Sequence, residues 1–294
     1  MTRNVAFLFP GQGGLPDTLP PLTTEIEALF EIAVSRGLPI RSWIEDGEAE
    51  RLFPTDVAQP AILIDSLAHD GALRRAGFTP ALVAGHSLGE FAALVSAGVL
   101  DAEDALALVI ERGALMAQAT GGAMAAIVKL DLETVERLCR NAGPEVVVAN
   151  HNGTHQVVVS GTEEAVAAVS EAAGAGGGRG IRLKVSGAFH SPFMADARDA
   201  LAERIDRTTF REPAVPIVSS VSGQVERDPE RIRSLVRDQM TACVRWADVM
   251  ERLVEHGVSQ AIEAGSGNVL TGLGRRFTEA VRFLTYEEAI DEDL

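Results

Sequence analysis

The sequence contains few cysteines and no long apolar run. Its two cysteines, Cys139 and Cys243, have no metal-ligand spacing and are too few for a disulfide framework. No apolar run approaches the roughly 20 residues of a membrane-spanning helix. The apolar residues before Pro10 are too few for the hydrophobic region of a signal peptide. We therefore expect a cytoplasmic protein with no bound metal and no membrane anchor.

Positive charge is also scarce. Lysine occurs only as Lys129 and Lys184, and the formal net charge is −16 at pH 7. Nucleic-acid binding depends on cationic contacts with phosphate, so this charge argues against a nucleic-acid partner. The same charge disfavours docking on anionic membrane surfaces.

The first 120 residues alternate between strand and helix patterns, which predicts a mostly parallel sheet covered by helices. Hydrophobic residues make up 46% of the 294-residue chain and charged residues 23%, as in ordinary globular proteins. The strands are expected at 5–9 and 80–86, and the helices at 23–37, 60–77, 88–100 and 101–119. Pro60 is expected to open the second helix and Asp101 to cap the last.

A different pattern occupies residues 123–185. Its order is strand, helix, strand, strand, helix, strand, which is the ferredoxin-like arrangement. The segment "GAGGGRG" inside it follows a helix and precedes a strand, the wrong order for a phosphate-binding loop. The predicted fold is therefore α/β, with a large domain built from residues 1–122 and 186–294 and a ferredoxin-like domain inserted at 123–185.

The stretch Gly85-His86-Ser87-Leu88-Gly89 matches the G-x-S-x-G nucleophile elbow. Small residues on both sides of the serine let a strand and a helix approach closely, which leaves the hydroxyl exposed at the helix N-terminus. There the backbone N–H of Leu88 can stabilise an oxyanion. The alternative interpretation is a glycine-rich turn without chemistry.

A nucleophilic serine needs a base, and His190 is the best candidate. His86 adjoins the serine, but a neighbouring side chain on a tight turn generally points elsewhere. Other histidines lie in predicted helices or strand ends. His190 lies in the irregular stretch "VSGAFHSPFM", where the chain returns from the inserted domain to the large one, and such loops often carry sites.

Nine motifs in order resemble those of malonyl-CoA:acyl-carrier-protein transacylases, a family that includes the acyltransferase domains of polyketide synthases. The motifs are FPGQGG, QPA, GHSLGE, ERGALM, GGAMAAI, NHNGTHQVVVSG, GAFHSPFM, VRW and GNVLTGL. They span nearly the whole chain. The resemblance implies an α/β-hydrolase-like domain with a ferredoxin-like insertion, in agreement with the pattern above.

The resemblance also implies catalytic roles. Ser87 would be the nucleophile and His190 the general base and acid. The backbone carbonyl of Gln239 would orient His190, in place of the carboxylate of a triad. The backbone N–H groups of Gln12 and Leu88 would form the oxyanion hole.

Further residues are implied in substrate binding. Arg112 would bind the free carboxylate of the malonyl group, because a planar guanidinium matches a carboxylate with two parallel hydrogen bonds. Asn152 and Gln59 would line the acyl pocket. The ring of Phe189 would fill the space that an α-methyl branch needs. Gly187 stands where the polyketide branch usually has histidine, so we expect a looser pocket here.

The implied reaction is a ping-pong transfer of malonyl from malonyl-CoA to the phosphopantetheine thiol of an acyl carrier protein. It needs no metal or redox cofactor, and we expect a monomer. The pathway is fatty acid or polyketide synthesis. The Gly-Ala-Phe-His-Ser and Asn-His-Asn stretches resemble free-standing acyltransferases that serve polyketide synthases in trans.

Three other functions stay open. The first is an acyl hydrolase that clears stalled carrier proteins, whose relatives lack the arginine at position 112. The second is an esterase with a Ser-Asp-His triad, and the third is a noncatalytic docking module. Carrier proteins are generally acidic, so docking on this acidic chain needs a local basic patch. The candidate residues are Arg179, Arg182, Arg275 and Arg276.

Overall fold

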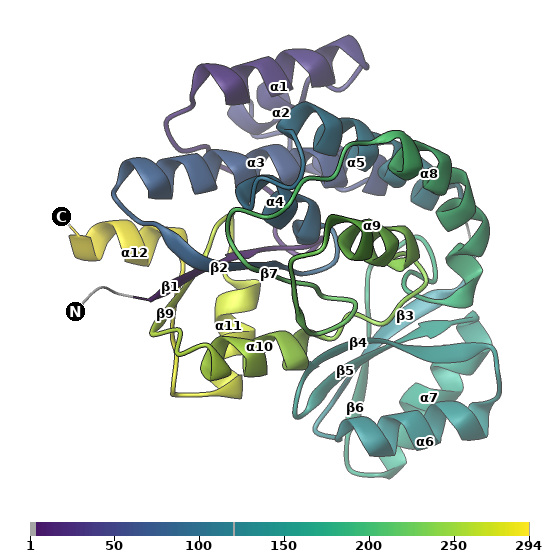
Figure 1. Cartoon of the computed structure of the whole chain (residues 1–294). Coiled ribbons are helices and arrows are strands. Elements are labelled where there is room, and N and C mark those ends of the chain that lie inside the picture. The colour runs from purple at the N-terminus through teal and green to yellow at the C-terminus, as the bar shows by residue number, and fades with distance from the viewer. Residues whose placement is uncertain (1–3, 120, 294) are drawn as a thin grey trace.

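The computed structural model describes residues 4–119 and 121–293, which form two sheets with flanking helices (Figure 1). The larger sheet has the strand order β10-β9-β1-β2-β7-β8. Its neighbouring strands are parallel, except that β7 and β8 form an antiparallel pair. The strands are β1 Val5–Phe9, β2 Pro80–Gly85, β7 Ile217–Val218, β8 Val225–Glu226, β9 Gln260–Glu263 and β10 Arg282–Leu284.

Helices cover both faces of this sheet, as the alternation of strands and helices predicts. In Figure 1, α3, α4 and α5 lie on one face, and α10 and α11 lie on the other. The helices outside residues 123–185 are α1 Thr24–Ser35, α2 Ile40–Glu45, α3 Thr55–Arg75, α4 Gly89–Ser96, α5 Ala102–Gln118, α8 Ala195–Arg207, α9 Pro229–Asp238, α10 Trp246–Glu255, α11 Val269–Phe277 and α12 Tyr286–Asp293. Short 3₁₀ turns occupy Ala49–Leu52 and Pro192–Met194.

Strand β1 shows why the sheet needs both layers. Successive side chains of a strand point to opposite faces. Phe7 and Phe9 therefore pack in the core formed with α3, α4 and α5. Ala6 and Leu8 pack in the core on the opposite face, formed with α10 and α11. A strand that is apolar on both sides is typical of a parallel sheet covered by helices.

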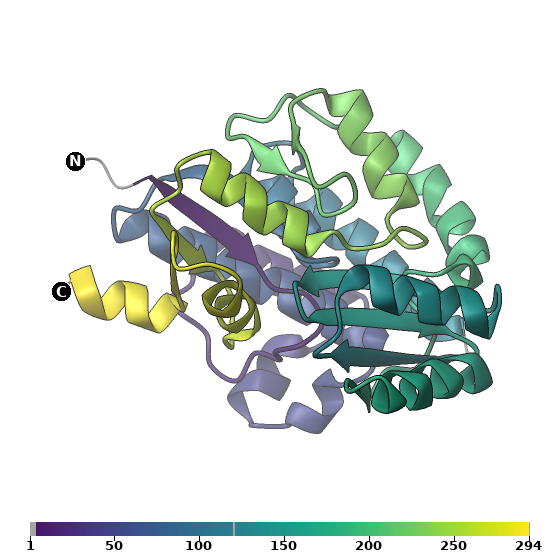
Figure 2. The same cartoon turned by 90° about the horizontal axis from the view of Figure 1, so that it is seen from below.

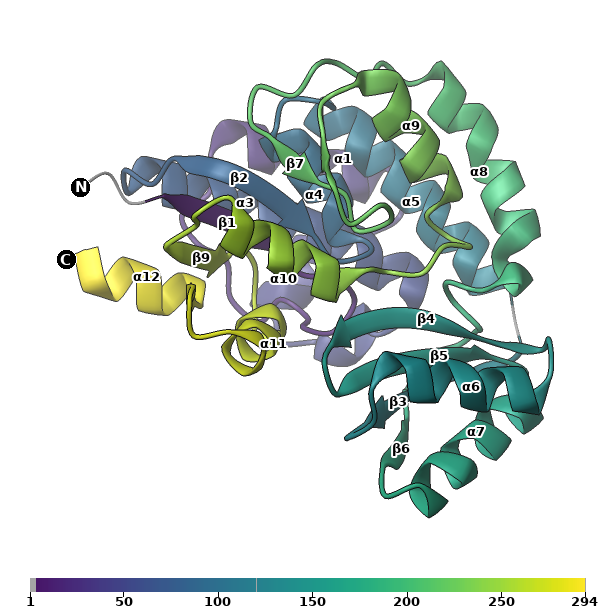
Figure 3. The ribbon, with the colours of Figure 1, turned by 60° about the horizontal axis from the view of Figure 1, so that its bottom comes forward.

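The smaller sheet is antiparallel and has the order β4-β5-β3-β6. Its elements are β3 Ala123–Val128, α6 Leu132–Ala142, β4 Val146–Gly153, β5 Gln156–Gly161, α7 Glu163–Ala175 and β6 Arg179–Arg182. Helices α6 and α7 cover the face that points away from the larger sheet (Figure 3). Side chains of the opposite face, such as Met124 and Val158, join the core of the larger unit. Figure 2 shows this smaller unit at the end of the molecule opposite α12.

Backbone hydrogen bonds join the two units. Gly121 and Gly187 form an isolated parallel bridge, so the chain leaves the larger unit and returns to it side by side. The N–H of His151 in β4 donates to Val244 O at 2.8 Å, and the N–H of Val244 donates to Ala149 O at 2.8 Å. These bonds hold the smaller sheet against the segment that leads into α10.

Three predicted helix ends differ in the structure. Helix α3 begins at Thr55, so Pro60 lies inside it and does not open it. A proline there removes one helix hydrogen bond. Close packing against α5 offsets this loss, since a Cβ added to Gly113 would lie 3.0 Å from Asp56 Cα. Helix α4 stops at Ser96 because Gly98 turns the chain with φ +78°.

The third difference concerns the start of α5. Asp101 occupies the N-cap position, as expected, but its side chain makes no capping hydrogen bond. Its carboxylate instead accepts two hydrogen bonds from Arg211, at 2.8 and 2.7 Å. The bidentate pair attaches this helix end to the segment that follows α8.

Candidate active site

Ser87 lies at the turn between β2 and α4, as the elbow motif predicts. Its φ is 52°, in the left-handed region that non-glycine residues rarely adopt. The flanking glycines permit this turn. A Cβ on Gly85 would lie 2.1 Å from the carbonyl carbon of Gly89, and a Cβ on Gly89 would lie 2.1 Å from Phe9 O. No other residue fits at either position without moving backbone.

His190 meets this serine from a distant part of the chain. Its Nε2 lies 2.7 Å from Ser87 Oγ. Its Nδ1 lies 3.0 Å from Gln239 O and 3.1 Å from Ala242 O. Carbonyl oxygens only accept hydrogen bonds, so Nδ1 carries the hydrogen and the Nε2 lone pair faces the serine hydroxyl. Two backbone carbonyls therefore occupy the place of a triad carboxylate, which contradicts the esterase alternative.

The His190 ring is neutral at physiological pH. Burial lowers its pKa, with a further contribution from the positive charge of Arg112, to about 3. A neutral imidazole can accept a proton from the serine without first losing one.

Arg112 of α5 lies beside the serine and is 1% exposed. Its Nη1 donates to Gln59 Oε1 at 2.6 Å, and its Nη2 donates to Gln239 Oε1 at 3.1 Å. The same Nη2 is 3.4 Å from Ser87 Oγ. Burial lowers the pKa of Arg112 to about 10, so the group is still charged at neutral pH. Within residues 4–119 and 121–293, no carboxylate forms an ion pair with it.

A cavity of about 250 Å³ connects these groups. Ser87, Arg112 and His190 line it together with Phe189 and Asn152. The face of the smaller sheet that packs against the larger unit, together with the segment after this sheet, supplies apolar walls: Met124, Ala126, Val158, Leu183 and Val185. The cavity thus brings the Ser87 hydroxyl, the His190 imidazole and the Arg112 guanidinium together at the junction of the two units.

Gln12 and Leu88 also line the cavity. Among the hydrogen bonds between described residues, none uses the backbone N–H of Gln12 or Leu88 as donor. The Gln12 side chain donates to Thr55 Oγ1 at 2.9 Å, which attaches its loop to the start of α3. Two backbone donors therefore face the region of the serine without a protein acceptor.

Two expectations about the pocket need correction. Gln59 does not line the cavity, because it is fully buried behind Arg112 and contacts the guanidinium. Gly187 does not loosen the pocket, because a Cβ there would lie 2.6 Å from Ala119 O. The space that a side chain would occupy at this position is already filled by backbone.

His86 does not act as the base, in line with the sequence argument. Its Nε2 bonds Asn152 Oδ1 at 2.9 Å, and its ring packs edge-on against Trp246 with centroids 5.3 Å apart. Burial lowers the pKa of His86, so the neutral ring donates to the amide oxygen. The Asn152 amide is thereby held at the cavity wall.

Two residues of this site, Glu90 and Met116, were not predicted from the sequence. Glu90, in the first turn of α4, is 2% exposed and accepts hydrogen bonds from Ser220 and Gln239. Met116 Sδ accepts a hydrogen bond from Gln59 Nε2 at 3.3 Å. One signal for Glu90 was available: it is the only charged residue in the apolar helix that follows the serine.

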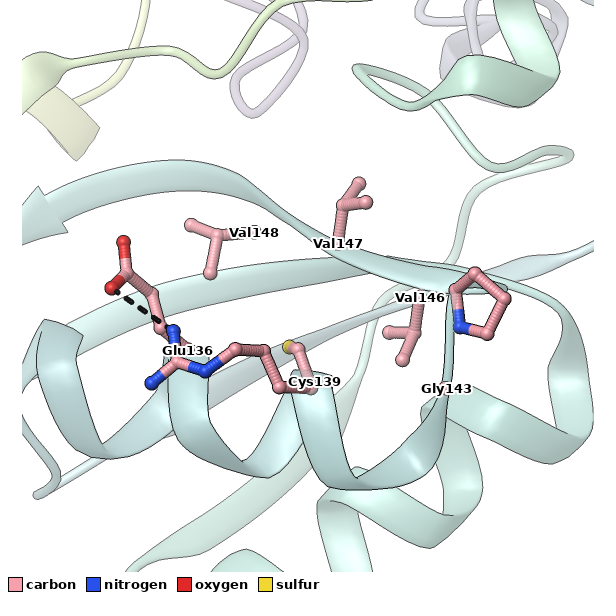
Figure 4. A pocket seen from close by; sticks show the side chains of 8 residues that line it. Glu136, Cys139, Gly143, Val146, Val147 and Val148 are labelled. Carbon is pink, nitrogen blue, oxygen red and sulfur yellow. Dashed lines mark ion pairs between the residues drawn. The ribbon is translucent and has the colours of Figure 1, made fainter.

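A second hollow lies on the smaller unit, between α6 and β4 (Figure 4). It measures about 560 Å³ and is lined by Cys139, three valines of β4 and the Glu136–Arg140 ion pair. Burial raises the pKa of the Cys139 thiol to about 11, so its thiolate is not available at neutral pH. This hollow contains no base beside a nucleophile, and the cavity at Ser87 is the site with reactive geometry.

Residues 4–119 and 121–293 contain neither a cluster of potential metal ligands nor a helix suited to span a membrane. No group of three histidine, cysteine, aspartate or glutamate side chains gathers there in a way that could hold a metal ion. None of the helices in the same residues combines the length and apolarity that a bilayer crossing requires.

A model of the acyl transferase domain family matches residues 24–281. The chain belongs to the acyl transferase family. It is 36% identical over 296 residues to the malonyl CoA-acyl carrier protein transacylase of Bacillus subtilis strain 168, covering 97% of this chain and 93% of that protein. It is 37% identical over 288 residues to the transacylase of the same name from Escherichia coli K12, covering 94% and 93%.

Solved acyl transferase structures share the whole architecture. A malonyl-CoA:acyl carrier protein transacylase from Xanthomonas oryzae superposes with a TM-score of 0.91 at 32% identity, covering 98% of both chains. A malonyl-transacylase solved in complex with its type II PKS acyl-carrier protein gives a TM-score of 0.88 at 36% identity, covering 96% of this chain and 94% of that one. The mixed α/β fold with two sheets is therefore a property of the family.

Proposed function

We propose that this protein transfers a malonyl group from malonyl-CoA to the phosphopantetheine thiol of an acyl carrier protein through an ester on Ser87. One observation carries the proposal: a buried, charged Arg112 lies within 3.4 Å of the Ser87 hydroxyl and is bonded by neutral amide oxygens. A cation of this kind suits the free carboxylate of an acyl group bound to the serine. The names of the relatives agree with malonyl as that group.

The first half-reaction forms the acyl-serine. Arg112 binds the malonyl carboxylate, which directs the thioester carbonyl toward Ser87 Oγ. His190 Nε2 accepts the hydroxyl proton as Oγ bonds to the carbonyl carbon. The backbone N–H groups of Gln12 and Leu88 stabilise the oxyanion. The carbon–sulfur bond then breaks, and His190 returns its proton to the departing CoA sulfur.

The second half-reaction reverses these steps with a different thiol. The carrier's phosphopantetheine thiol gives its proton to His190 and attacks the malonyl-Ser87 ester. The ester bond breaks, and His190 protonates Ser87 Oγ. No net proton, electron or metal is required. The ring of Phe189 lies at the cavity wall, where it would oppose an α-methyl branch on the acyl group.

A hydrolase that clears stalled carriers would use the same Ser87 and His190. Arg112 disfavours that function, because a cation beside the serine selects acyl groups that carry a second carboxylate. A noncatalytic docking module would not need a bonded Ser87–His190 pair. Transfer is therefore the function that this site supports best.

The finer description of the fold belongs to the same proposal. We infer an α/β-hydrolase-like domain from residues 1–122 and 186–294 and a ferredoxin-like insertion at 123–185. The β4-β5-β3-β6 order and the crossing at Gly121 and Gly187 support these boundaries. A monomer in the cytoplasm, acting in fatty acid or polyketide synthesis, stays a prediction.

A transfer assay tests the function directly. Purified protein is mixed with malonyl-CoA and a phosphopantetheinylated acyl carrier protein, and the carrier's mass is followed with time. We expect malonyl-carrier to accumulate with little free malonate. Rapid release of malonate without carrier loading would instead support the hydrolase.

A further inference from the structure

Arg112 carries a buried positive charge, and the proposed reaction does not explain which group of the protein balances it. An uncompensated charge is costly to bury, so a buried arginine normally pairs with a carboxylate. A direct pair would, however, occupy the donors that the proposed substrate needs. The structure has a buried carboxylate nearby that does not touch the guanidinium, namely Glu90.

Gln239 links these two charges through its side-chain amide. Its Nε2 donates to Glu90 Oε2 at 2.6 Å and to the backbone oxygen of Ser87 at 3.1 Å. Its Oε1 accepts from Arg112 Nη2 at 3.1 Å. The backbone oxygen of the same residue accepts from His190. One residue thus contacts the nucleophile's backbone, the base and the cation.

Glu90 and the backbone oxygen of Ser87 together determine which way this amide points. A carboxylate and a peptide oxygen can only accept hydrogen bonds, so the end of the Gln239 amide that faces them must be the NH₂ group. The oxygen end must then face Arg112. Ser220 fixes the carboxylate in turn, since its N–H donates to Glu90 Oε1 at 3.2 Å and its hydroxyl donates to Oε2 at 2.8 Å.

We propose that Glu90 is a positioning residue for substrate selection, which balances the Arg112 charge through the Gln239 amide and leaves the guanidinium open to the substrate carboxylate. The amide dipole lies between the two charges, with each end bonded to the charge of opposite sign. The negative charge of Glu90 raises the pKa of Arg112, opposing the lowering by burial. Burial raises the pKa of Glu90 in turn, and the hydrogen bonds from Gln239 and Ser220 oppose that rise by stabilising the carboxylate. This inference rests on the proposed role of Arg112.

The test compares acylation of Ser87 by malonyl-CoA and by acetyl-CoA, taking the ratio of the two kcat/KM values. That ratio cancels effects on Ser87 and His190, which act on both substrates alike. In E90Q only the backbone oxygen of Ser87 still specifies the Gln239 orientation, because the neutral side chain at position 90 can both donate and accept. The malonyl preference is expected to fall about tenfold, the effect of one hydrogen bond to a charged group.

A charge swap gives a sharper test. In the double variant E90Q/Q239E the number of buried charges is unchanged, but the carboxylate now contacts Arg112 directly. We expect this variant to lose the malonyl preference by about tenfold or more, because the new ion pair competes with the substrate. Its unfolding temperature should fall, because a carboxylate at position 239 cannot donate to the backbone oxygen of Ser87. The swap also serves if E90Q alone does not fold.

Glu263 provides the matched control. It is a second glutamate at 1% exposure, and it accepts from the N–H groups of Leu270 and Thr271 at the start of α11. E263Q makes the same chemical change without contacting Gln239 or Arg112, so its malonyl preference should equal that of the wild type.

The outcomes separate the two proposals. If Arg112→Ala keeps the wild-type malonyl preference, the proposed function fails. A second outcome would refute the role of Glu90 and leave the proposed function standing. In it, Arg112→Ala loses the malonyl preference, but E90Q and the double variant E90Q/Q239E keep the preference of E263Q within about twofold. A difference of about twofold is smaller than the loss of one hydrogen bond to a charged group would cause.

Discussion

Ser87 Oγ and His190 Nε2 lie 2.7 Å apart, and both residues have left-handed backbones, with φ of 52° and 55°. Such conformations cost about 1–3 kcal/mol in non-glycine residues and are typical of functional sites. The strained backbone that brings the serine and the imidazole together therefore lowers the free energy of unfolding.

This strain can be measured at Ser87. Ser87→Gly and Ser87→Ala both remove the hydroxyl and its hydrogen bond to His190, but only glycine relieves the strained φ. We expect Ser87→Gly to be about 1 kcal/mol more stable than Ser87→Ala in chemical denaturation, with both variants inactive. Equal unfolding midpoints would show that the turn stores no strain.

The pH below which kcat/KM for acylation begins to fall, the acid limb of the pH profile, should be unusually low. The proposed role of His190 as a base requires its neutral form, and burial lowers its pKa to about 3 from 6.5, so protonation begins far below neutral pH. We expect kcat/KM for acylation to change by less than about twofold from pH 8 to 5.5, where a base with an ordinary pKa would lose about tenfold. An inflection near pH 6.5 would contradict this assignment.

The same argument predicts how a neighbouring charge acts. Arg112 lowers the pKa of His190, so Arg112→Ala should raise that pKa and move the acid limb toward higher pH. The profile is measured with acetyl-CoA, because the variant lacks the cation that binds malonyl. An acid limb at the same pH in Arg112→Ala and the wild type would mean that Arg112 does not contribute to the low pKa of His190.

Gly187 should matter for stability and not for pocket width. Its missing Cβ would lie 2.6 Å from Ala119 O, so Gly187→Ala should destabilise the protein by about 1–3 kcal/mol. Gly174, inside α7 with nothing within 4 Å of an added Cβ, is the matched control and should tolerate alanine. A Gly187→Ala variant as stable as the control would restore the idea of open space at this position.

The four candidate docking arginines are not equivalent. Arg182 pairs with Glu163 and Arg275 with Glu288. Arg276 lies on α11, which lines the cavity, and forms no ion pair with any described residue.

We therefore expect Arg276→Glu to weaken carrier loading most, while acylation by malonyl-CoA is retained. Transfer rates at varied carrier concentration and salt measure this. Arg207→Glu makes the same charge change on α8, away from the cavity, and serves as control. Unchanged transfer kinetics after Glu substitution at Arg179, Arg182, Arg275 and Arg276 would refute this patch.

The elbow could be predicted from sequence because its requirements are local. Gly85, Ser87 and Gly89 lie within five residues, and the strand and helix around them have clear patterns. His190 needed one more clue, its place where the chain returns from residues 123–185. The α/β class, with a mostly parallel sheet in the first 120 residues and a different pattern over residues 123–185, followed from the order of strand and helix patterns along the chain.

The rest depends on contacts that no local pattern reports. Glu90 and Gln239 are 149 positions apart, so the hydrogen bond between them appears only in the folded chain. Pro60 looked like a helix start because proline is common there, but packing against α5 extends α3 past it. Gln59 was predicted to line the pocket because a matched motif gives a residue's position along the chain. The motif does not report whether the side chain reaches the cavity or is buried behind its wall.

The most direct test of the central claim is the intact mass of the protein after brief incubation with malonyl-CoA or acetyl-CoA. The account predicts a malonyl adduct on the wild type and none on Ser87→Ala. It also predicts that the acetyl adduct is much less abundant than the malonyl adduct on the wild type and that this preference disappears in Arg112→Ala. An acetyl adduct on the wild type as abundant as the malonyl adduct, or an adduct on Ser87→Ala, would contradict the assignment of Arg112 or Ser87.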